Sequence, residues 1–317
     1  MKIKTYQSNY THPLDVLTFI TQAQDHEDCA LVVVTGTDGG GVRAPGALMA
    51  VTRSGKAAGY VSNGCVDGDV ILNAQQAISQ NKPVELRYGK DSPFFDIKLP
   101  CGGSLDLLIA PNPDSKLIAL AEKKLRQRRS LMLLFNPDGS LSVDDNQTDK
   151  TGWRDKAFLG RYFPKPKLRV IGRGAEPLAL ARLGLSCDMD VLLQSPDKSV
   201  IAHAKTFGAK AELIQLGQDL KSQDDPWTAC ILMFHDHDWE YDILIQALKH
   251  KAFYIGALGS LKTHNIRCDI LRAQGVSEPD INRIRAPIGL IPSMRDASML
   301  AISTLADVAG AYQEAIK

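Results

Sequence analysis

Hydrophobic positions in the first half of the chain follow helical and strand-like spacings in turn. Apolar residues three and four positions apart predict an amphipathic helix over residues 13–22. The continuous, valine-rich apolar run over residues 29–34 predicts a buried strand. Further segments of both kinds follow, namely a hairpin of residues 47–52 and 56–61, a helix over 67–79, strands over 84–88 and 104–109, a helix over 115–128 and a hairpin around 136–139. The pattern therefore predicts an α+β unit.

The second half alternates apolar strand-like runs with amphipathic helical segments. The expected strands are 168–171, 189–193, 229–234 and 253–255, and the expected helices are 175–184, 198–206, 239–250, 260–274 and 294–315. Such alternation predicts βαβ units and a parallel sheet. A polar segment near residue 150 separates the halves. We therefore expect an α/β chain, with an N-terminal α+β domain over residues 1–150 and a C-terminal Rossmann-type domain over residues 151–317.

Length and composition agree with about two soluble globular domains, since 317 residues are 44% hydrophobic and 23% charged. Lys and Arg number 37 against 36 Asp and Glu, and this balance argues against a dedicated nucleic-acid binder. No apolar run approaches the roughly 18 residues of a membrane-spanning helix, and the N-terminus lacks the apolar core of a secretory signal. The expectation is a cytoplasmic protein that binds neither nucleic acid nor membrane.

A glycine-rich turn follows the expected strand over residues 168–171. Gly172 would permit the tight turn, Gly174 would let a phosphate approach the backbone, and the next helix would offer free N–H groups. Pro177 replaces the third glycine of the dinucleotide fingerprint, and Gln194 lies where an acidic residue would bind the ribose. The turn therefore favours a phosphate-bearing ligand and disfavours NAD(P).

A His-Asp-His-Asp segment ends the third strand of this half, at the edge where open α/β sheets bind ligands. His235 and His237 with their flanking carboxylates are compatible with a metal site. The plain alternative is a capping turn in which Asp238 begins the helix. We favour a polar edge of a ligand site, without a metal bound directly to the protein.

Another strand-to-helix turn contains glycine where close approach is needed. Gly256, Gly259 and Ser260 would form a second anion cradle. Lys262 or Arg267 would neutralise a phosphate there. The alternative is an ordinary turn in which Ser260 caps the helix.

Glycine-flanked residues with reactive side chains also occur in the first half. Arg43 precedes an Ala-Pro-Gly corner and is placed to bind a phosphate or carboxylate. Cys65 lies just before a helix start expected near Asp67, where backbone N–H groups stabilise a thiolate, and Cys101 lies on a Pro-Cys-Gly-Gly turn. A lone cysteine in a turn is usually inert, but two such cysteines in one domain make a sulfur or ligand role an equal alternative. The remaining cysteines are expected in the core, namely Cys29, Cys187, Cys230 and Cys268.

In their order along the chain, these motifs resemble the XdhC/CoxI family, the xanthine dehydrogenase accessory proteins. The matching segments are 43–49, 62–68, 101–103, 170–174, 235–237, 254–260 and 286–290. The resemblance implies an N-terminal XdhC/CoxI domain, a C-terminal Rossmann domain and a homodimer. Cys65 and Cys101 match the two glycine-flanked cysteines of the family.

The resemblance also implies a function. Such a protein binds the molybdenum cofactor (molybdopterin carrying molybdenum) as cargo, holds it while a cysteine desulfurase supplies the terminal sulfur, and delivers it to a xanthine-dehydrogenase-type molybdoenzyme. The candidate cofactor-binding residues are Arg43, Cys65, Cys101, Gly172, Gly174, His235, His237, Gly256, Gly259 and Ser260.

No pair of groups spaced for acid–base catalysis emerges, so we expect a cofactor chaperone rather than a turnover enzyme. Three alternatives stay open. The first is an NAD(P)-dependent oxidoreductase that uses the Rossmann domain. The second is a sulfur carrier with a persulfide on Cys65 or Cys101, and the third is a scaffold that only docks the target enzyme.

Overall fold

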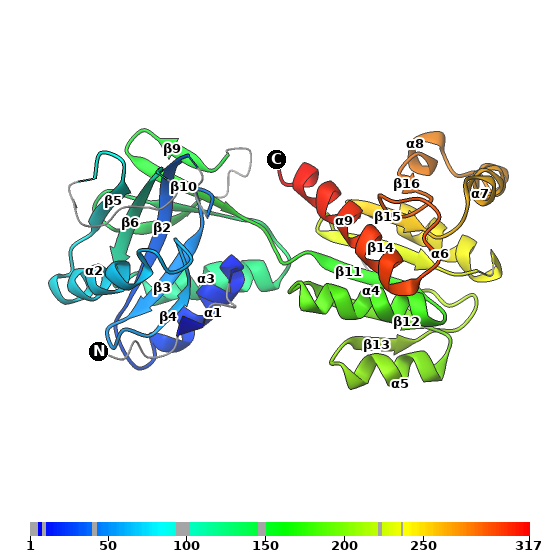
Figure 1. Ribbon diagram of the computed structural model, residues 1–317, viewed down its shortest axis with the longest axis horizontal. Coiled ribbons are helices and arrows are strands. Elements are labelled where there is room, and N and C mark those ends of the chain that lie inside the picture. The colour runs from blue at the N-terminus through cyan, green and yellow to red at the C-terminus, as the bar shows by residue number, and fades with distance from the viewer. Residues whose placement is uncertain are drawn as a thin grey trace. The chain divides into compact units, whose positions relative to one another are not determined.

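The chain folds into two compact units, Met1–Pro164 and Lys165–Lys317 (Figure 1). This computed structural model describes residues 6–7, 11–39, 43–92, 102–144, 150–220, 224–235 and 237–317. The division falls later than the expected boundary at residue 150, because the strands just beyond that point complete a sheet of the first unit. Within the described ranges, no helix is long and apolar enough to cross a membrane.

The first unit combines two sheets with helices, which fits the expected α+β pattern. The larger sheet has the order β1-β4-β3-β2-β6-β5, and the smaller, antiparallel sheet has the order β8-β7-β10-β9. The strands are β1 (Tyr6–Gln7), β2 (Cys29–Asp38), β3 (Leu48–Thr52), β4 (Ala57–Gly59), β5 (Val84–Gly89), β6 (Ser104–Pro111), β7 (Leu131–Phe135), β8 (Leu141–Asp144), β9 (Gly152–Arg154) and β10 (Ala157–Tyr162). The helices are α1 (Pro13–Ala23), α2 (Asp67–Gln80) and α3 (Ser115–Arg126).

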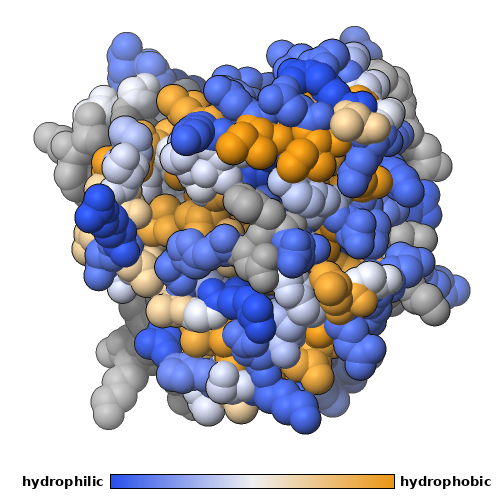
Figure 2. All heavy atoms as spheres, turned by 90° about the vertical axis from the view of Figure 1, so that its right-hand side faces the viewer, coloured by the Kyte–Doolittle hydropathy of each residue, from blue (hydrophilic) through white to orange (hydrophobic). Residues whose placement is uncertain are grey.

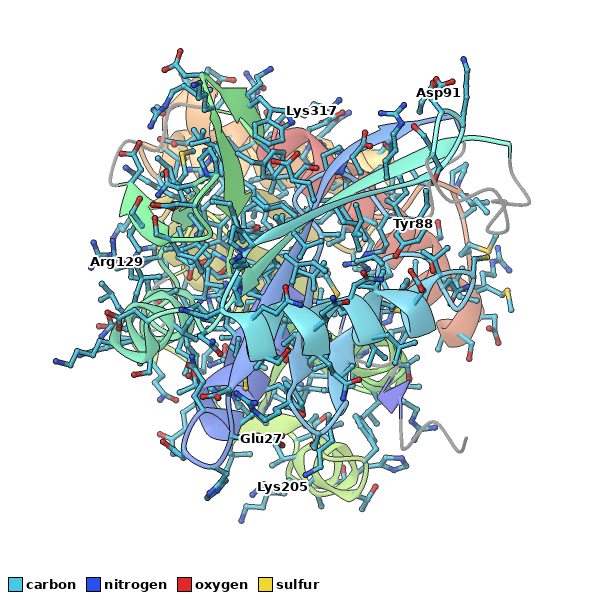
Figure 3. All side chains as sticks on the ribbon, turned by 90° about the vertical axis from the view of Figure 1, so that its left-hand side faces the viewer. Glu27, Tyr88, Asp91, Arg129, Lys205 and Lys317 are labelled. Carbon is cyan, nitrogen blue, oxygen red and sulfur yellow. The ribbon has the colours of Figure 1, made fainter. Side chains whose placement is uncertain are left out.

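The larger sheet of the first unit has an apolar core on each face. On one face, Val70, Ala74 and Ala77 of α2 pack against side chains such as Leu86 and Tyr88 of β5. Figure 3 views the unit from the side that α2 covers, with Tyr88 labelled. On the other face, α1, α3 and the smaller sheet close a second core. Successive residues of β2 in this sheet therefore point alternately into the two apolar cores.

The second unit has a wholly parallel sheet in the order β13-β12-β11-β14-β15-β16. This is the Rossmann strand order, so the expected α/β class is confirmed. The strands are β11 (Lys167–Gly172), β12 (Asp190–Ser195), β13 (Lys210–Leu213), β14 (Thr228–Met233), β15 (Tyr254–Ala257) and β16 (Ile284–Arg285). The helices are α4 (Ala175–Ser186), α5 (Lys198–Thr206), α6 (Glu240–Leu248), α7 (Leu261–Ala273), α8 (Glu278–Ile281) and α9 (Ala297–Ala315), with a 3-10 turn over His237–Trp239.

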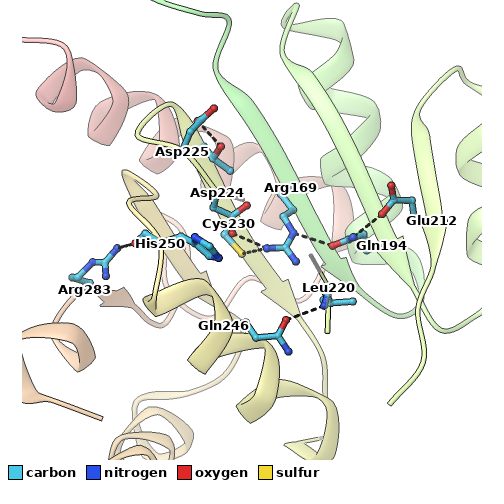
Figure 4. Close-up of polar contacts among 11 residues, drawn as sticks. Arg169, Gln194, Glu212, Leu220, Asp224, Asp225, Cys230, Gln246, His250 and Arg283 are labelled. Carbon is cyan, nitrogen blue, oxygen red and sulfur yellow. Dashed lines mark hydrogen bonds and ion pairs between the residues drawn. The ribbon is translucent and has the colours of Figure 1, made fainter. Parts of the chain in front are cut away.

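A buried polar network crosses this parallel sheet (Figure 4). The side chain of Arg169 on β11 is 1% exposed, and its Nη1 donates to Asp224 Oδ2 at 2.6 Å. Its Nε donates to Gln194 Oε1 at 2.9 Å, and Gln194 Nε2 donates onward to Glu212 Oε2 at 2.8 Å. Gln194 is therefore committed to the sheet interior and does not present its amide to a ligand at the edge.

Burial separates the cysteines into two groups. Cys29, Cys230 and Cys268 are buried, as expected. The expectation for Cys187 was wrong, because this residue is the C-cap of α4 and is exposed, beyond the helical turns that face the core. Cys65 is also exposed, and Cys101 lies outside the described residues.

Burial should also separate these thiols by reactivity. Loss of hydration raises the pKa of both Cys29 and Cys230 to about 12, so near pH 8 each is a protonated, shielded thiol. Under brief iodoacetamide treatment followed by peptide mass spectrometry, we expect Cys65 and Cys187 to be modified well before Cys29 and Cys230. Urea-unfolded protein should lose this order. Equal rates for Cys187 and Cys230 in the folded protein would contradict the burial of Cys230.

Candidate functional site

One edge of the larger sheet in the first unit gathers the candidate residues of that unit. Strands β2 and β5 end there and β6 begins there, because Ser104 pairs with both Asp38 and Gly89. The chain enters β3 after Arg43 and leaves β4 toward Cys65 at the same edge. Cys101 lies outside the described residues.

The segment that presents Cys65 is held by a buried carboxylate. Asp67, the first residue of α2, is 2% exposed, and its Oδ1 accepts from the backbone N–H groups of Val61 at 2.8 Å and Ser62 at 3.1 Å. Its Oδ2 accepts from Gly64 N–H. The helix start near Asp67 is confirmed, and the carboxylate fixes the turn so that Cys65 remains at the surface.

Arg43 is one cation of this edge. Its guanidinium lies 4.8 Å from the centre of the Tyr60 ring, and its Nη2 donates to the Thr11 carbonyl at 2.9 Å. Tyr60 directly precedes the segment held by Asp67. No acidic side chain among the described residues pairs with Arg43, so its positive charge is available to an anion.

In the second unit, the turn after β11 depends on glycine and has a carboxylate beside it. A Cβ on Gly172 would lie 2.3 Å from the Met233 carbonyl oxygen, and Gly174 has φ +82°. Glu176, in the first turn of α4, brings its carboxylate to this turn, because its Oε2 would lie 3.4 Å from a Cβ on Gly174. Its Oε1 lies 3.2 Å from His235 Nε2. A carboxylate here opposes a second anion, and sequence reasoning missed it.

A cavity of about 460 Å³ lies at the carboxyl edge of β14, β15 and β16. Of the expected residues it is lined by His235, Gly259 and Ser260, together with the chain over residues 287–295. Leu261 and Ile291 on its wall are 65% and 52% exposed. Figure 2, which faces the second unit, shows apolar side chains at the surface between polar ones. This cavity combines a polar edge with an apolar wall.

Ser260 caps α7, since its Oγ accepts from Thr263 N–H at 3.2 Å. This agrees with the alternative of an ordinary turn in which Ser260 caps the helix. Gly259 has φ +135° beside Thr263. Gly256 serves packing, because a Cβ there would lie 2.6 Å from the Tyr254 ring and 2.9 Å from Ile288. The structure thus explains each of these residues by the fold of the turn itself.

Two further expectations for this edge need correction. Arg267 is not available to a phosphate, because its fully buried guanidinium donates to Glu240 Oε1 and to the Leu258 carbonyl, both at 2.7 Å. Asp238 does not cap α6, since the residue at the N-cap is Trp239. The side chain of His237 is not described, and no group of three metal-ligating side chains occurs among the residues that are.

Comparison with known proteins gives consistent matches. The XdhC Rossmann domain model matches residues 168–308, and the model of the XdhC and CoxI family matches residues 22–89. The molybdenum cofactor insertion chaperone PaoD of Escherichia coli K12 is 33% identical, over 93% of this chain and 87% of PaoD. A probable xanthine dehydrogenase subunit of Bacillus subtilis 168 is 21% identical, over 90% of this chain and 93% of that protein. A crystal structure of a xanthine dehydrogenase from Bacillus halodurans superposes with a TM-score of 0.76 at 18% identity, covering 96% of each chain.

Proposed function

The chain belongs to the XdhC/CoxI family, and we propose that it acts as a molybdenum-cofactor chaperone. It holds the cofactor during sulfuration by a cysteine desulfurase and delivers it to a xanthine-dehydrogenase-type molybdoenzyme. Its similarity to PaoD over nearly the whole chain supports the accessory role. A homodimer and a cytoplasmic location are part of the same proposal.

The observation that carries this proposal is that the segments of Arg43 and Cys65 lie at one sheet edge of the first unit. The cargo has a phosphate, which suits the Arg43 guanidinium, since no acidic side chain among the described residues pairs with it. It also has a molybdenum centre awaiting sulfur, with which a soft thiolate neighbour is compatible, and Cys65 is exposed there. Cys101 belongs to the proposed site through its family match alone.

The second unit contributes a different kind of surface to this proposal. His235, Gly259 and Ser260 line its cavity, whereas at the turn after β11 Gly174 lies beside the carboxylate of Glu176 and Gly172 lies against Met233. That carboxylate disfavours a pyrophosphate at the turn. We therefore keep NAD(P) as the disfavoured alternative and assign the cavity, rather than the turn, to the cargo or its partner protein.

The test is the amount of cofactor that stays with the purified protein. We expect Cys65→Ala and Arg43→Ala each to lower the molar ratio of bound molybdopterin, by about tenfold for loss of the charge-assisted contact of Arg43. Acid oxidation releases the pterin as a fluorescent product that can be quantified against protein. Cys187→Ala is the matched control, since Cys187 is also an exposed cysteine but lies in the second unit, outside the proposed site. Wild-type protein without affinity for molybdopterin would overturn the proposal.

A further inference from the structure

A second cavity, also of about 460 Å³, lies in the first unit and is lined by neither Arg43 nor Cys65. Thr35 of β2, Glu85 and Arg87 of β5, and Asp106 of β6 line its sheet side, and Trp153 of β9 contributes from the smaller sheet. Glu85 and Arg87 alternate with Leu86 and Tyr88, which face α2. The cavity therefore lies on the face of the larger sheet away from α2.

Trp153 gives this cavity an aromatic wall. The side chain is 53% exposed, which is unusual for the largest apolar residue in a short strand. Its ring meets Phe158 in an edge-on contact, with centroids 5.5 Å apart and an interplanar angle of 73°. That contact orients the indole while leaving a ring face for stacking against a flat ligand.

The charged groups of the cavity differ in whether they have a partner among the described residues. Each nitrogen of Arg87 has a partner, since its Nη1 donates to Asp106 Oδ1 at 3.1 Å, its Nη2 to Ser104 Oγ at 3.3 Å and its Nε to the Lys90 carbonyl at 3.1 Å. Glu85 is exposed and has no partner among the described residues. The cavity thus offers one unpaired carboxylate, which accepts two parallel N–H bonds most strongly from a planar, amidine-like edge.

We propose that this cavity binds a 2-amino-4-oxopyrimidine ring. The amino group and the adjacent ring N–H of that ring donate to Glu85, while the ring face stacks on Trp153. Two sources present this edge, namely the pterin of the proposed cargo and a guanine nucleotide. Adenine lacks the ring N–H beside its amino group and does not fit. For the pterin source, the inference rests on the proposed chaperone function.

The test is tryptophan fluorescence of the full chain titrated with pterin-6-carboxylate, GMP and AMP. We expect quenching by pterin-6-carboxylate, by GMP or by both, and none by AMP. Trp153→Phe should abolish the quenching, which separates Trp153 from Trp227 and Trp239. Glu85→Gln should weaken binding about tenfold, since it removes a charge-assisted acceptor pair. Asp25→Asn, an exposed acid of the same unit outside the cavity, is the matched control.

The outcomes separate this inference from the proposed function. Quenching by pterin-6-carboxylate alone identifies the cargo as the source, and quenching by GMP alone identifies a guanine nucleotide. Quenching by neither, or equal quenching of wild type and Trp153→Phe, overturns the inference. Molybdopterin that co-purifies at wild-type levels with Glu85→Gln and Trp153→Phe would leave the chaperone function standing without the pterin assignment. If the protein binds GMP and has no affinity for molybdopterin, the inference about this cavity stands and the chaperone function fails.

Discussion

We expect Arg267→Met to lower the free energy of unfolding of the second unit by about 3–5 kcal/mol. Both members of the ion pair are buried, with the Arg267 side chain 0% and the Glu240 side chain 1% exposed. Without the guanidinium, the Glu240 carboxylate and the Leu258 carbonyl each lose a donor at 2.7 Å. A buried carboxylate that has lost its cation is far more costly than the apolar replacement itself. Urea unfolding followed by circular dichroism measures the change.

Variants of the partner residues make this prediction specific to the buried pair. Arg272→Met on the same helix is the matched control, because its ion pairs with Asp269 and Glu278 are exposed, and we expect a change within about 1 kcal/mol. The double variant Arg267→Met/Glu240→Gln should recover part of the loss, since no charge is then left buried. If Arg267→Met proved as stable as Arg272→Met, the assigned role of the pair would be wrong.

The alternation of strands and helices in the second half was predictable because it depends on neighbours along the chain. The helix expected over residues 175–184 corresponds to α4, and the strand expected over residues 229–234 corresponds to β14. Strands β13 and β16, at the two edges of the sheet, were not expected. They are short, and their apolar signal is weak because edge strands are only partly covered.

Polar residues were harder to place, because their role depends on partners that are distant in the sequence. Arg267 lies on a helix with other charged residues and has the pattern of a surface cation. In the structure it is buried and forms an ion pair with Glu240 of another helix. Arg169 pairs with Asp224, which lies 55 residues further along the chain, and both side chains are buried. The cavity around Trp153 is built from four strands of two sheets, so no local pattern indicates it.

At the proposed site of the first unit, the local element was again predictable and the role of a polar residue was not. The helix start beside Cys65 was predicted, because it follows from the apolar spacing within α2. The function of Asp67 was not, since an acidic residue in the first helical turn usually stabilises the helix dipole from the surface. Instead the carboxylate is buried and turned back toward the preceding segment. The position of Cys65 therefore depends on a residue that sequence reasoning treated only as a helix start.

We expect Asp67→Ala to lower the free energy of unfolding of the first unit by about 3 kcal/mol, because it leaves the buried N–H groups of Val61 and Ser62 without an acceptor and also removes the acceptor of the exposed Gly64. Asp67→Asn keeps one amide oxygen and should lose less. Urea unfolding of the variants measures both changes.

Gly68→Ala is the matched control for this prediction. It alters the next residue of α2, where a Cβ meets nothing within 4 Å, and its stability should equal or exceed that of wild type. The freed segment should also increase the rate at which iodoacetamide modifies Cys65 in Asp67→Ala, because the turn that fixes the thiol has lost its acceptor. Unchanged stability together with an unchanged Cys65 rate would show that Asp67 does not hold this segment. Asp67→Ala leaves Arg43 unchanged. If this variant loses bound molybdopterin, the charge of Arg43 alone does not retain the proposed cargo, and the fixed position of Cys65 is also needed.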